Sequence, residues 1–240
     1  MDYPSQEPKM FGVYSVTGGI GKSTLSLMTT NVLSKWKKTL LLSFEGAWGL
    51  KHYFTGVQNR RLTDLVYSYL AEPEEVRKKH LEEVPKEQTV GAFFLAPART
   101  ADEWQELSAE ELSGFLNALK AEYPYLVLDF GRELVHPFKE LLLGCDYQML
   151  LIDPSEEGRD RMKEAAFELS DLSHPLIYGR YPVGSQVLEE ERPDPDYFDL
   201  HGLKMLPEEP SLFRQGRPPK KLRKDTEYFK MLRDDLKELW

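Results

Sequence analysis

Residues 15–24 read SVTGGIGKST, and this stretch contains the residue types best able to bind a charged ligand. Its glycines lack a Cβ, so the backbone can turn its N–H groups inward as a nest for an anion. These glycines are Gly18, Gly19 and Gly21. Lys22 supplies a point charge for the β- and γ-phosphates of a nucleotide, and the hydroxyl of Ser23 can ligate Mg²⁺. The stretch predicts a phosphate-binding loop.

The elements that flank the loop are those that such a site requires. An apolar, β-rich run precedes it at 10–16, apolar residues at helical spacing follow from Lys22 to Trp36, and a second buried strand is expected at 38–44. Strand, loop, helix and strand form a βαβ unit, which imposes a parallel sheet. Val16 occupies the first glycine position of the strict G-x-x-x-x-G-K-[ST] pattern, so a glycine-rich turn that binds nothing is the alternative.

The rest of the chain continues the alternation of strands and helices. Further strands are expected at 90–98, 125–130, 147–153, 174–181 and 202–207, and helices at 62–70, 108–123, 156–172 and 226–240. Residues 72–88 are predicted to form exposed helix and loop, and residues 182–199 a loop excursion. We expect a single doubly wound α/β domain over 1–240, mostly parallel and flanked by helices, after a polar lead-in at 1–9.

Composition and charge exclude several classes of protein. A formal charge of −9 argues against nucleic-acid binding by the whole surface. The segment RQGRPPKKLRK at 214–224 is nevertheless basic and could meet DNA, acidic lipid or an acidic partner, or be a solvated loop. Cys145 is the single cysteine, which excludes an internal disulfide and favours a reducing cytoplasm. No stretch reaches the ~20 apolar residues of a membrane span.

Several segments together resemble a known family, the deviant-Walker ATPases of the ParA/MinD group, whose loop reads K-G-G-x-G-K-[ST]-T. The similar segments are TGGIGKST, KTLLLSFEGAWGL, YLVLDFG at 125–131 and LPEEPSLFRQGRPP at 206–219. The resemblance spans nearly the whole chain and implies the P-loop NTPase fold. Among its branches, the chain looks most like the TadZ/CpaE-type proteins of pilus assembly.

The resemblance also implies roles for individual residues. It implies contacts to ATP or ADP from Thr17, Gly18, Gly19, Ile20, Gly21, Lys22, Ser23, Thr24 and Arg180. Ser23 and Asp129 are the implied Mg²⁺ ligands, Asp129 acting through water. Lys22 and Glu45 are the implied catalytic residues, with Glu45 positioning water. The alternative for Asp129 is a helix N-cap or turn aspartate, and the alternative for Arg180 is a solvent-exposed arginine.

The departures from the family pattern decide how much activity we expect. Thr17 stands where the family has a signature lysine that reaches the phosphates of a dimer partner. Ser43 and Glu45 stand where the family has two acidic residues. We therefore expect nucleotide and Mg²⁺ binding to be retained, hydrolysis to be slow, and any homodimer to form without requiring ATP.

The expected function is that of a cytoplasmic, ATP-binding, weakly hydrolysing protein that helps to localise or assemble a pilus or secretion machine. Its partners would recruit it to the cell pole or inner membrane. The alternatives are a pseudo-ATPase scaffold whose nucleotide is structural, and a DNA-partitioning ATPase that uses the basic segment 214–224. The C-terminal helix carries acids as well as apolar residues, so we expect it to dock on the sheet and not on lipid.

We predict that ATP turnover is below about one per minute, against about 10 per second for a typical enzyme. Thr17 cannot supply the cross-protomer charge, and a cation of this kind is worth roughly 10³–10⁵ in rate. A steady-state assay of phosphate release measures the turnover. Turnover of several per second would show that another cation of the protein replaces the lysine.

Overall fold

Seven parallel strands form the centre of the structure, a computed structural model that describes residues 7–45, 61–72, 93–95, 98, 101–166, 172, 175–180, 203–207 and 226–239. The strands are β1 Lys9–Tyr14, β2 Thr39–Ser43, β3 Phe93–Leu95, β4 Tyr125–Asp129, β5 Tyr147–Ile152, β6 Pro175–Gly179 and β7 Lys204–Met205. They lie in the order β3-β2-β4-β1-β5-β6-β7, and every neighbouring pair is parallel. The expected doubly wound α/β fold is confirmed.

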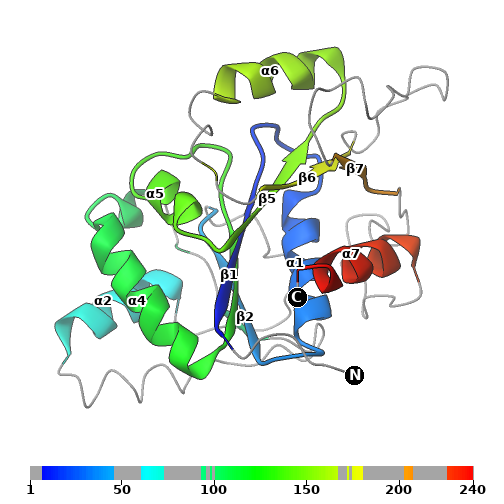
Figure 1. Cartoon of the computed structure of the whole chain (residues 1–240). Coiled ribbons are helices and arrows are strands. Elements are labelled where there is room, and N and C mark those ends of the chain that lie inside the picture. Colours follow the sequence, from blue (N-terminus) through cyan, green and yellow to red (C-terminus); the bar gives the residue numbers. More distant parts are fainter. Residues whose placement is uncertain are drawn as a thin grey trace.

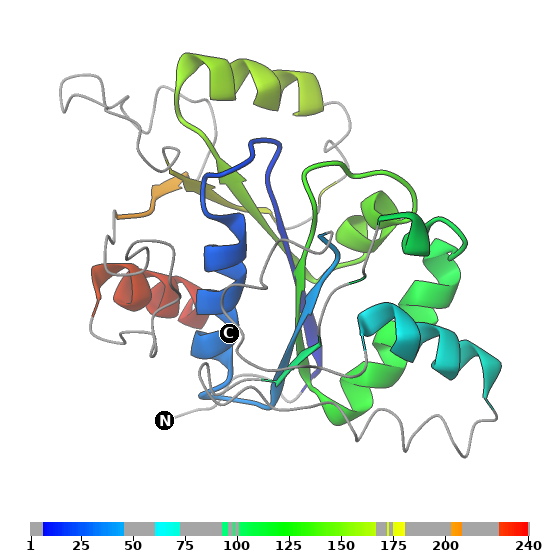
Figure 2. The same cartoon turned by 180° about the vertical axis from the view of Figure 1, so that it is seen from behind.

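Helices cover both faces of this sheet. They are α1 Lys22–Leu33, α2 Leu62–Ala71, α4 Ala109–Glu122, α5 Phe138–Leu143, α6 Glu156–Ala166 and α7 Glu227–Lys237, and a short 3₁₀ helix spans Ala101–Trp104. In Figures 1 and 2, α1 and α7 lie on one face and α2, α4 and α5 on the other, with α6 at one end of the sheet. The chain therefore forms three layers.

The alternation of side chains along the strands builds one apolar core on each face. In β1, Met10 and Tyr14 join the cluster that contains α2, α4 and α5. Phe11 and Val13 point the other way and join the cluster that contains α1 and α7. Because the central strands are buried on both faces, they are continuous apolar runs, which is the pattern that the sequence shows.

Most of the predicted elements are present, with shorter bounds. The strand expected at 10–16 ends at Tyr14 in the structure, because Ser15 already begins the loop. Helix α4 begins at the expected capping box: Ser108 Oγ accepts from the Glu111 N–H at 3.2 Å, and Glu111 Oε2 accepts from the Ser108 N–H at 2.8 Å. Predictions for 72–88, 182–199 and 214–224 concern segments that lie, apart from Glu72, outside the described residues.

Two short helices were not predicted, α5 and the 3₁₀ helix. Helix α5 has a signal in the sequence, since Phe138, Leu141 and Leu142 recur at helical spacing and all three are buried. Six residues are too few for that spacing to stand out from a loop.

The C-terminal helix packs against the body of the protein. Thr226 caps α7 by accepting from the Phe229 N–H at 3.2 Å. The helix buries Tyr228, Phe229, Leu232 and Leu236 in the cluster that contains α1. Figure 1 shows α7 beside α1 on the same face of the sheet, and Lys204 of β7 donates to Asp235 of α7 at 2.6 Å, so the expected docking on the sheet is confirmed. Among the described residues, no helix is both long enough and apolar enough to cross a membrane.

Gly12 sets the approach of α5 to the sheet, and we predict that Gly12→Ala destabilises the fold by about 1–3 kcal/mol. A Cβ on Gly12 would lie 2.7 Å from Leu142 Cδ1 and 2.8 Å from Cys145 Sγ, both in the buried core. Gly114→Ala is the matched control, because a Cβ there meets nothing within 4 Å. In the middle of α4 it should stabilise by about 0.5–1 kcal/mol. Urea denaturation of both variants measures the two effects, and equal stabilities would contradict this packing.

Candidate functional site

The loop between β1 and α1 adopts a conformation that depends on glycine. Gly19 and Gly21 have φ angles of 78° and 102°, in the left-handed region that other residues rarely adopt. Ser15 steadies the start of the loop, since its Oγ accepts from the Thr17 N–H at 3.1 Å. A Cβ at Gly18 or Gly19 would meet nothing within 4 Å, so that side of the loop is open. The backbone is therefore shaped as the sequence predicted for an anion site.

The N-terminus of α1 has no side-chain cap. Gly21 is its N-cap residue, no side chain caps the helix there, and the first turn contains no acidic residue. Helices α4 and α7, by contrast, are capped by Ser108 and Thr226. The positive dipole end of α1 therefore has no acidic side chain or N-cap side chain to compensate it, which suits a ligand anion.

The register of the sheet brings two acids to this helix end. Asp129, the last residue of β4, pairs with Val13 in β1 and with Ser43 in β2. The loop follows β1, and Glu45 lies two residues beyond Ser43. Since the carboxyl ends of parallel strands share one edge, Asp129 and Glu45 both face the start of α1.

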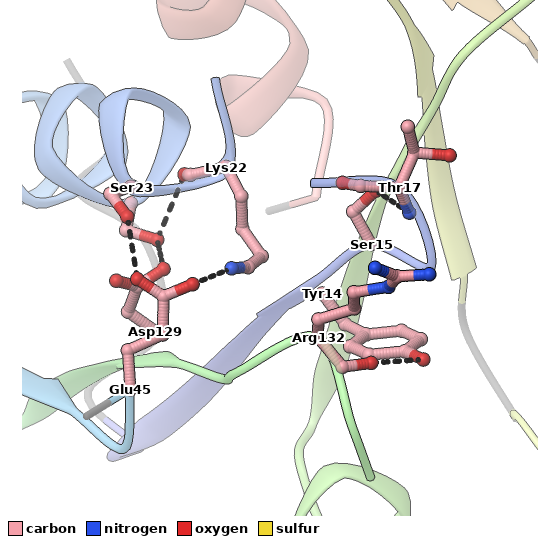
Figure 3. Close-up of polar contacts among 9 residues, drawn as sticks. Tyr14, Ser15, Thr17, Lys22, Ser23, Glu45, Asp129 and Arg132 are labelled. Carbon is pink, nitrogen blue, oxygen red and sulfur yellow. Dashed lines mark hydrogen bonds and ion pairs between the residues drawn. The ribbon is translucent and has the colours of Figure 1, made fainter. Parts of the chain in front are cut away.

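Glu45 forms an ion pair with the loop lysine (Figure 3). The Lys22 ammonium donates to Glu45 Oε1, and Ser23 Oγ lies 3.4 Å from Glu45 Oε2. The Lys22 side chain is buried and Glu45 is partly exposed. Two predicted catalytic residues and one predicted Mg²⁺ ligand are thus brought together, and the lysine has a carboxylate partner in place of a phosphate.

Asp129 is a fully buried carboxyl with one unpaired oxygen. Its Oδ1 accepts from Ser26 Oγ at 2.7 Å, whereas Oδ2 has no hydrogen-bond partner within the described chain. Burial raises the pKa of Asp129 to about 6; Lys22 opposes this rise, Glu45 adds to it, and the nearby hydroxyls of Ser26 and Ser23 oppose it. A buried oxygen of this kind is costly unless a cation or donor reaches it.

The oxygens at this position fit Mg²⁺ held together with a nucleotide. Mg²⁺ binds through one or two carboxylates, substrate phosphates and several waters. The free oxygen of Asp129 and the hydroxyl of Ser23 supply the protein's share of such a set. Within the described residues, no group of three or more His, Cys, Asp and Glu side chains could hold a metal alone. The geometry therefore fits a metal that arrives with phosphate.

Thr17 and Arg180 lie on other sides of the loop. Thr17 is buried and lies apart from the contact between Lys22 and Glu45 (Figure 3). Arg180 follows β6 and is only 5% exposed, so the alternative of a solvent-exposed arginine is wrong. Its Nη1 lies 2.7 Å from the position that a Cβ on Gly21 would take. Arg180 therefore contacts the phosphate loop.

The remaining predicted residues contribute through the backbone. The side chain of Ile20 belongs to the core with α1 and α7, and Thr24 is buried within α1. Any contact of Ile20 with phosphate must therefore come from its N–H group. Gly18 and Gly19 have no side chain, so their contacts with phosphate would also come from backbone N–H groups.

Two neighbours of the site were missed by the sequence analysis. Ser26 bonds Asp129, and its place three residues after Ser23 on one helix face is the signal that could have indicated it. Arg132 is exposed, and its guanidinium points toward the loop that carries Thr17 (Figure 3). The Arg132 carbonyl accepts from the Tyr14 hydroxyl at 3.1 Å, which ties this segment to β1.

Comparison of the sequence with known proteins finds a distant relative. No protein-family model matches the chain. The septum site-determining protein MinD of Helicobacter pylori is 23% identical over 147 residues, which are 59% of this chain and 52% of that protein. The match thus spans about half the length of that relative.

Solved structures match along nearly the whole chain. A ParA family ATPase from Chlorobium tepidum TLS has a TM-score of 0.77 at 17% identity, covering 98% of this chain and 100% of that one. MinD of Pyrococcus horikoshii, complexed with Mg-ADP, has a TM-score of 0.72 at 17% identity, covering 96% of each chain. The chain has the fold of the ParA/MinD P-loop ATPases.

The buried carboxyl of Asp129 leads to a prediction about pH. Its folded pKa of about 6 lies above the ordinary 3.8, so the native state binds this proton more tightly than the unfolded state. The resulting stabilisation is present below about pH 4 and is lost as the pH rises through about 6. We therefore expect Asp129→Asn, without nucleotide, to raise the free energy of unfolding by about 1–3 kcal/mol at about pH 7.5, and not at about pH 4.

Urea denaturation of both proteins across this pH range measures the difference. Ser26→Ala is a useful companion, since it removes the hydrogen bond to the ionised carboxyl and should destabilise more at neutral than at acid pH. An Asp129→Asn variant that is less stable than the wild type at neutral pH would contradict the predicted effect.

Proposed function

We propose that the chain is an ATP-binding, slowly hydrolysing protein of the ParA/MinD type. The observation that carries this proposal is the cluster of Lys22, Ser23, Glu45 and Asp129 around the uncapped start of α1. The MinD structure from Pyrococcus horikoshii, which is complexed with Mg-ADP, supports the choice of ligand.

Each residue of the cluster has a distinct role in this proposal. The glycine loop and the first turn of α1 donate N–H groups to the phosphates. Lys22 would exchange Glu45 for phosphate oxygens, and Ser23 and Asp129 would hold a Mg²⁺ ion that supplies counter-charge to the acids. Glu45, once released, is able to orient a water molecule. A bound Mg²⁺ would neutralise charge that develops on the phosphates.

The finer proposal concerns the branch and the process. Segments such as KTLLLSFEGAWGL and YLVLDFG support a TadZ/CpaE-type protein that localises or assembles a pilus or secretion machine. It would act as a homodimer in the cytoplasm and reach the pole or the inner membrane through its partners. Thr17 supports slow hydrolysis, since it carries no charge to a partner's phosphates.

A scaffold with structural nucleotide is the second candidate, and the pairing of Glu45 with Lys22 favours it. Only a catalyst needs Glu45 to be free, so Glu45→Gln would abolish turnover in an ATPase and change nothing but affinity in a scaffold. A DNA-partitioning ATPase would depend on the basic segment 214–224, which is outside the described residues, and salt-dependent retention on DNA would distinguish it.

We predict that Lys22→Ala abolishes ATP binding measurable by calorimetry in the presence of Mg²⁺. The wild type should bind in the micromolar range, because charge-assisted hydrogen bonds contribute about 1.5–3 kcal/mol each. The variant lacks the ammonium that would contact the phosphates. It also lacks the positive charge that offsets the carboxylates of Glu45 and Asp129. Lys230→Ala, an exposed lysine of α7, is the matched control and should bind as the wild type does. Equal affinities of the wild type and Lys22→Ala would refute the assignment of the loop.

A further inference from the structure

Arg180 is a buried cation for which the family resemblance implies a contact with ATP or ADP, and the structure bears on which part of the nucleotide it would contact. Its backbone N–H donates to the Ile152 carbonyl at 2.8 Å, so the residue is anchored where β5 and β6 end. Its side chain then lies against Gly21, the residue before the loop lysine. A guanidinium presents a planar fork of donors, which makes it well suited to bind an anion that accepts several hydrogen bonds.

The order of the strands places Arg180 on one flank of the loop. In the sheet, β4 and β2 lie on one side of β1, and β5 and β6 lie on the other. Asp129 and Glu45 come from the first side, and Arg180 comes from the second. A phosphate chain with its terminal group and metal at Lys22, Ser23 and Asp129 would extend across the loop toward Arg180.

We propose that Arg180 binds the inner phosphates of the nucleotide, the α- and β-groups that ATP and ADP share. The inference rests on the proposed nucleotide binding and deepens it. In this proposal, Arg180 is a second positively charged residue, besides Lys22, that contacts the nucleotide bound to its own chain. Thr17 carries no charge and cannot make the corresponding contact with the nucleotide of a dimer partner. A planar fork of donors suits phosphate oxygens better than a point charge does.

The conformation of Gly21 explains how Arg180 can approach the loop so closely. Its lack of a Cβ leaves room for the guanidinium, because a methyl group there would lie only 2.7 Å from Nη1 and in contact with Cζ at 3.4 Å. The glycine thus serves both the turn of the loop and the approach of Arg180. The guanidinium reaches the loop backbone itself, where phosphate-binding N–H groups gather.

An interaction with inner phosphates has a defined consequence for activity. Since ATP and ADP share these groups, Arg180 strengthens binding of both nucleotides equally. Binding that is equal in the ground state and the transition state raises affinity without raising the rate of the bound enzyme. Arg180 is therefore compatible with the slow turnover expected from Thr17.

The experiment measures binding of ATP, ADP and inorganic tripolyphosphate, each with Mg²⁺, to the wild type and to Arg180→Gln. We expect the variant to lose affinity for all three by a similar factor of roughly 10 to 100, the value of a charge-assisted contact. A guanidinium that stacks on adenine would lower the affinity for ATP and ADP and leave tripolyphosphate unchanged. That result would overturn the inference.

Two further variants act as controls. Arg132→Gln removes the same charge from an exposed side chain near the loop, and it should weaken binding less than Arg180→Gln does. Equal losses would show a long-range effect of net charge and overturn the inference. Arg180→Lys keeps a positive charge and should lose less affinity for tripolyphosphate than the glutamine variant.

The outcome remains decisive even when one variant is unstable. If Arg180→Gln does not fold, Arg180→Lys is compared with the wild type, and a matched fall for ATP and tripolyphosphate supports the phosphate contact. A fall for ATP alone contradicts it. Failure of the wild type to bind any of the three ligands would instead refute the proposed function, so the two failures are distinguishable.

Discussion

The ion pair between Lys22 and Glu45 is the interaction on which the rest of the site depends. Two carboxyls, Glu45 and Asp129, lie near the start of α1, and Lys22 interacts favourably with both. Without a ligand, the lysine therefore stabilises acids that would otherwise repel each other in a partly buried place. A phosphate that binds the loop must draw Lys22 away, and the acids then need another cation. Mg²⁺ meets this need, which explains in physical terms why the metal and the nucleotide would bind together.

The fold makes this exchange possible by placing charges from distant parts of the chain at one edge. Asp129 in β4 pairs with Val13 in β1 and with Ser43 in β2. This register brings the phosphate loop after β1, the Asp129 carboxyl and Glu45 after β2 to the same edge of the sheet. The tight contact of α5 with the sheet at Gly12 and the packing of α7 on α1 hold these strands and the helix in position. The positive φ angles at Gly19 and Gly21 then turn the backbone toward the anion. Arg180 completes the set from the opposite flank.

Local patterns made much of this structure predictable from the sequence. The glycine loop, the helical spacing after Lys22 and the capping box at Ser108 each involve residues a few positions apart, so the amino-acid sequence alone predicts these features. The contact of Arg180 with Gly21 joins residues 159 positions apart and depends on strand order, which local patterns do not encode. The pairing of Lys22 with Glu45 was missed for another reason: both residues were assigned roles toward a ligand, and the sequence gives no indication of how they compensate each other without it.

A structure of the protein with a non-hydrolysable ATP analogue and Mg²⁺ tests the exchange of partners by Lys22 most directly. We expect the Lys22 ammonium to contact phosphate oxygens and to be out of hydrogen-bond reach of Glu45. The metal should then lie between Ser23 and Asp129. A nucleotide that binds while the ion pair of Lys22 and Glu45 stays closed would contradict the central claim, because the loop lysine would then serve the protein's own acid and not the ligand.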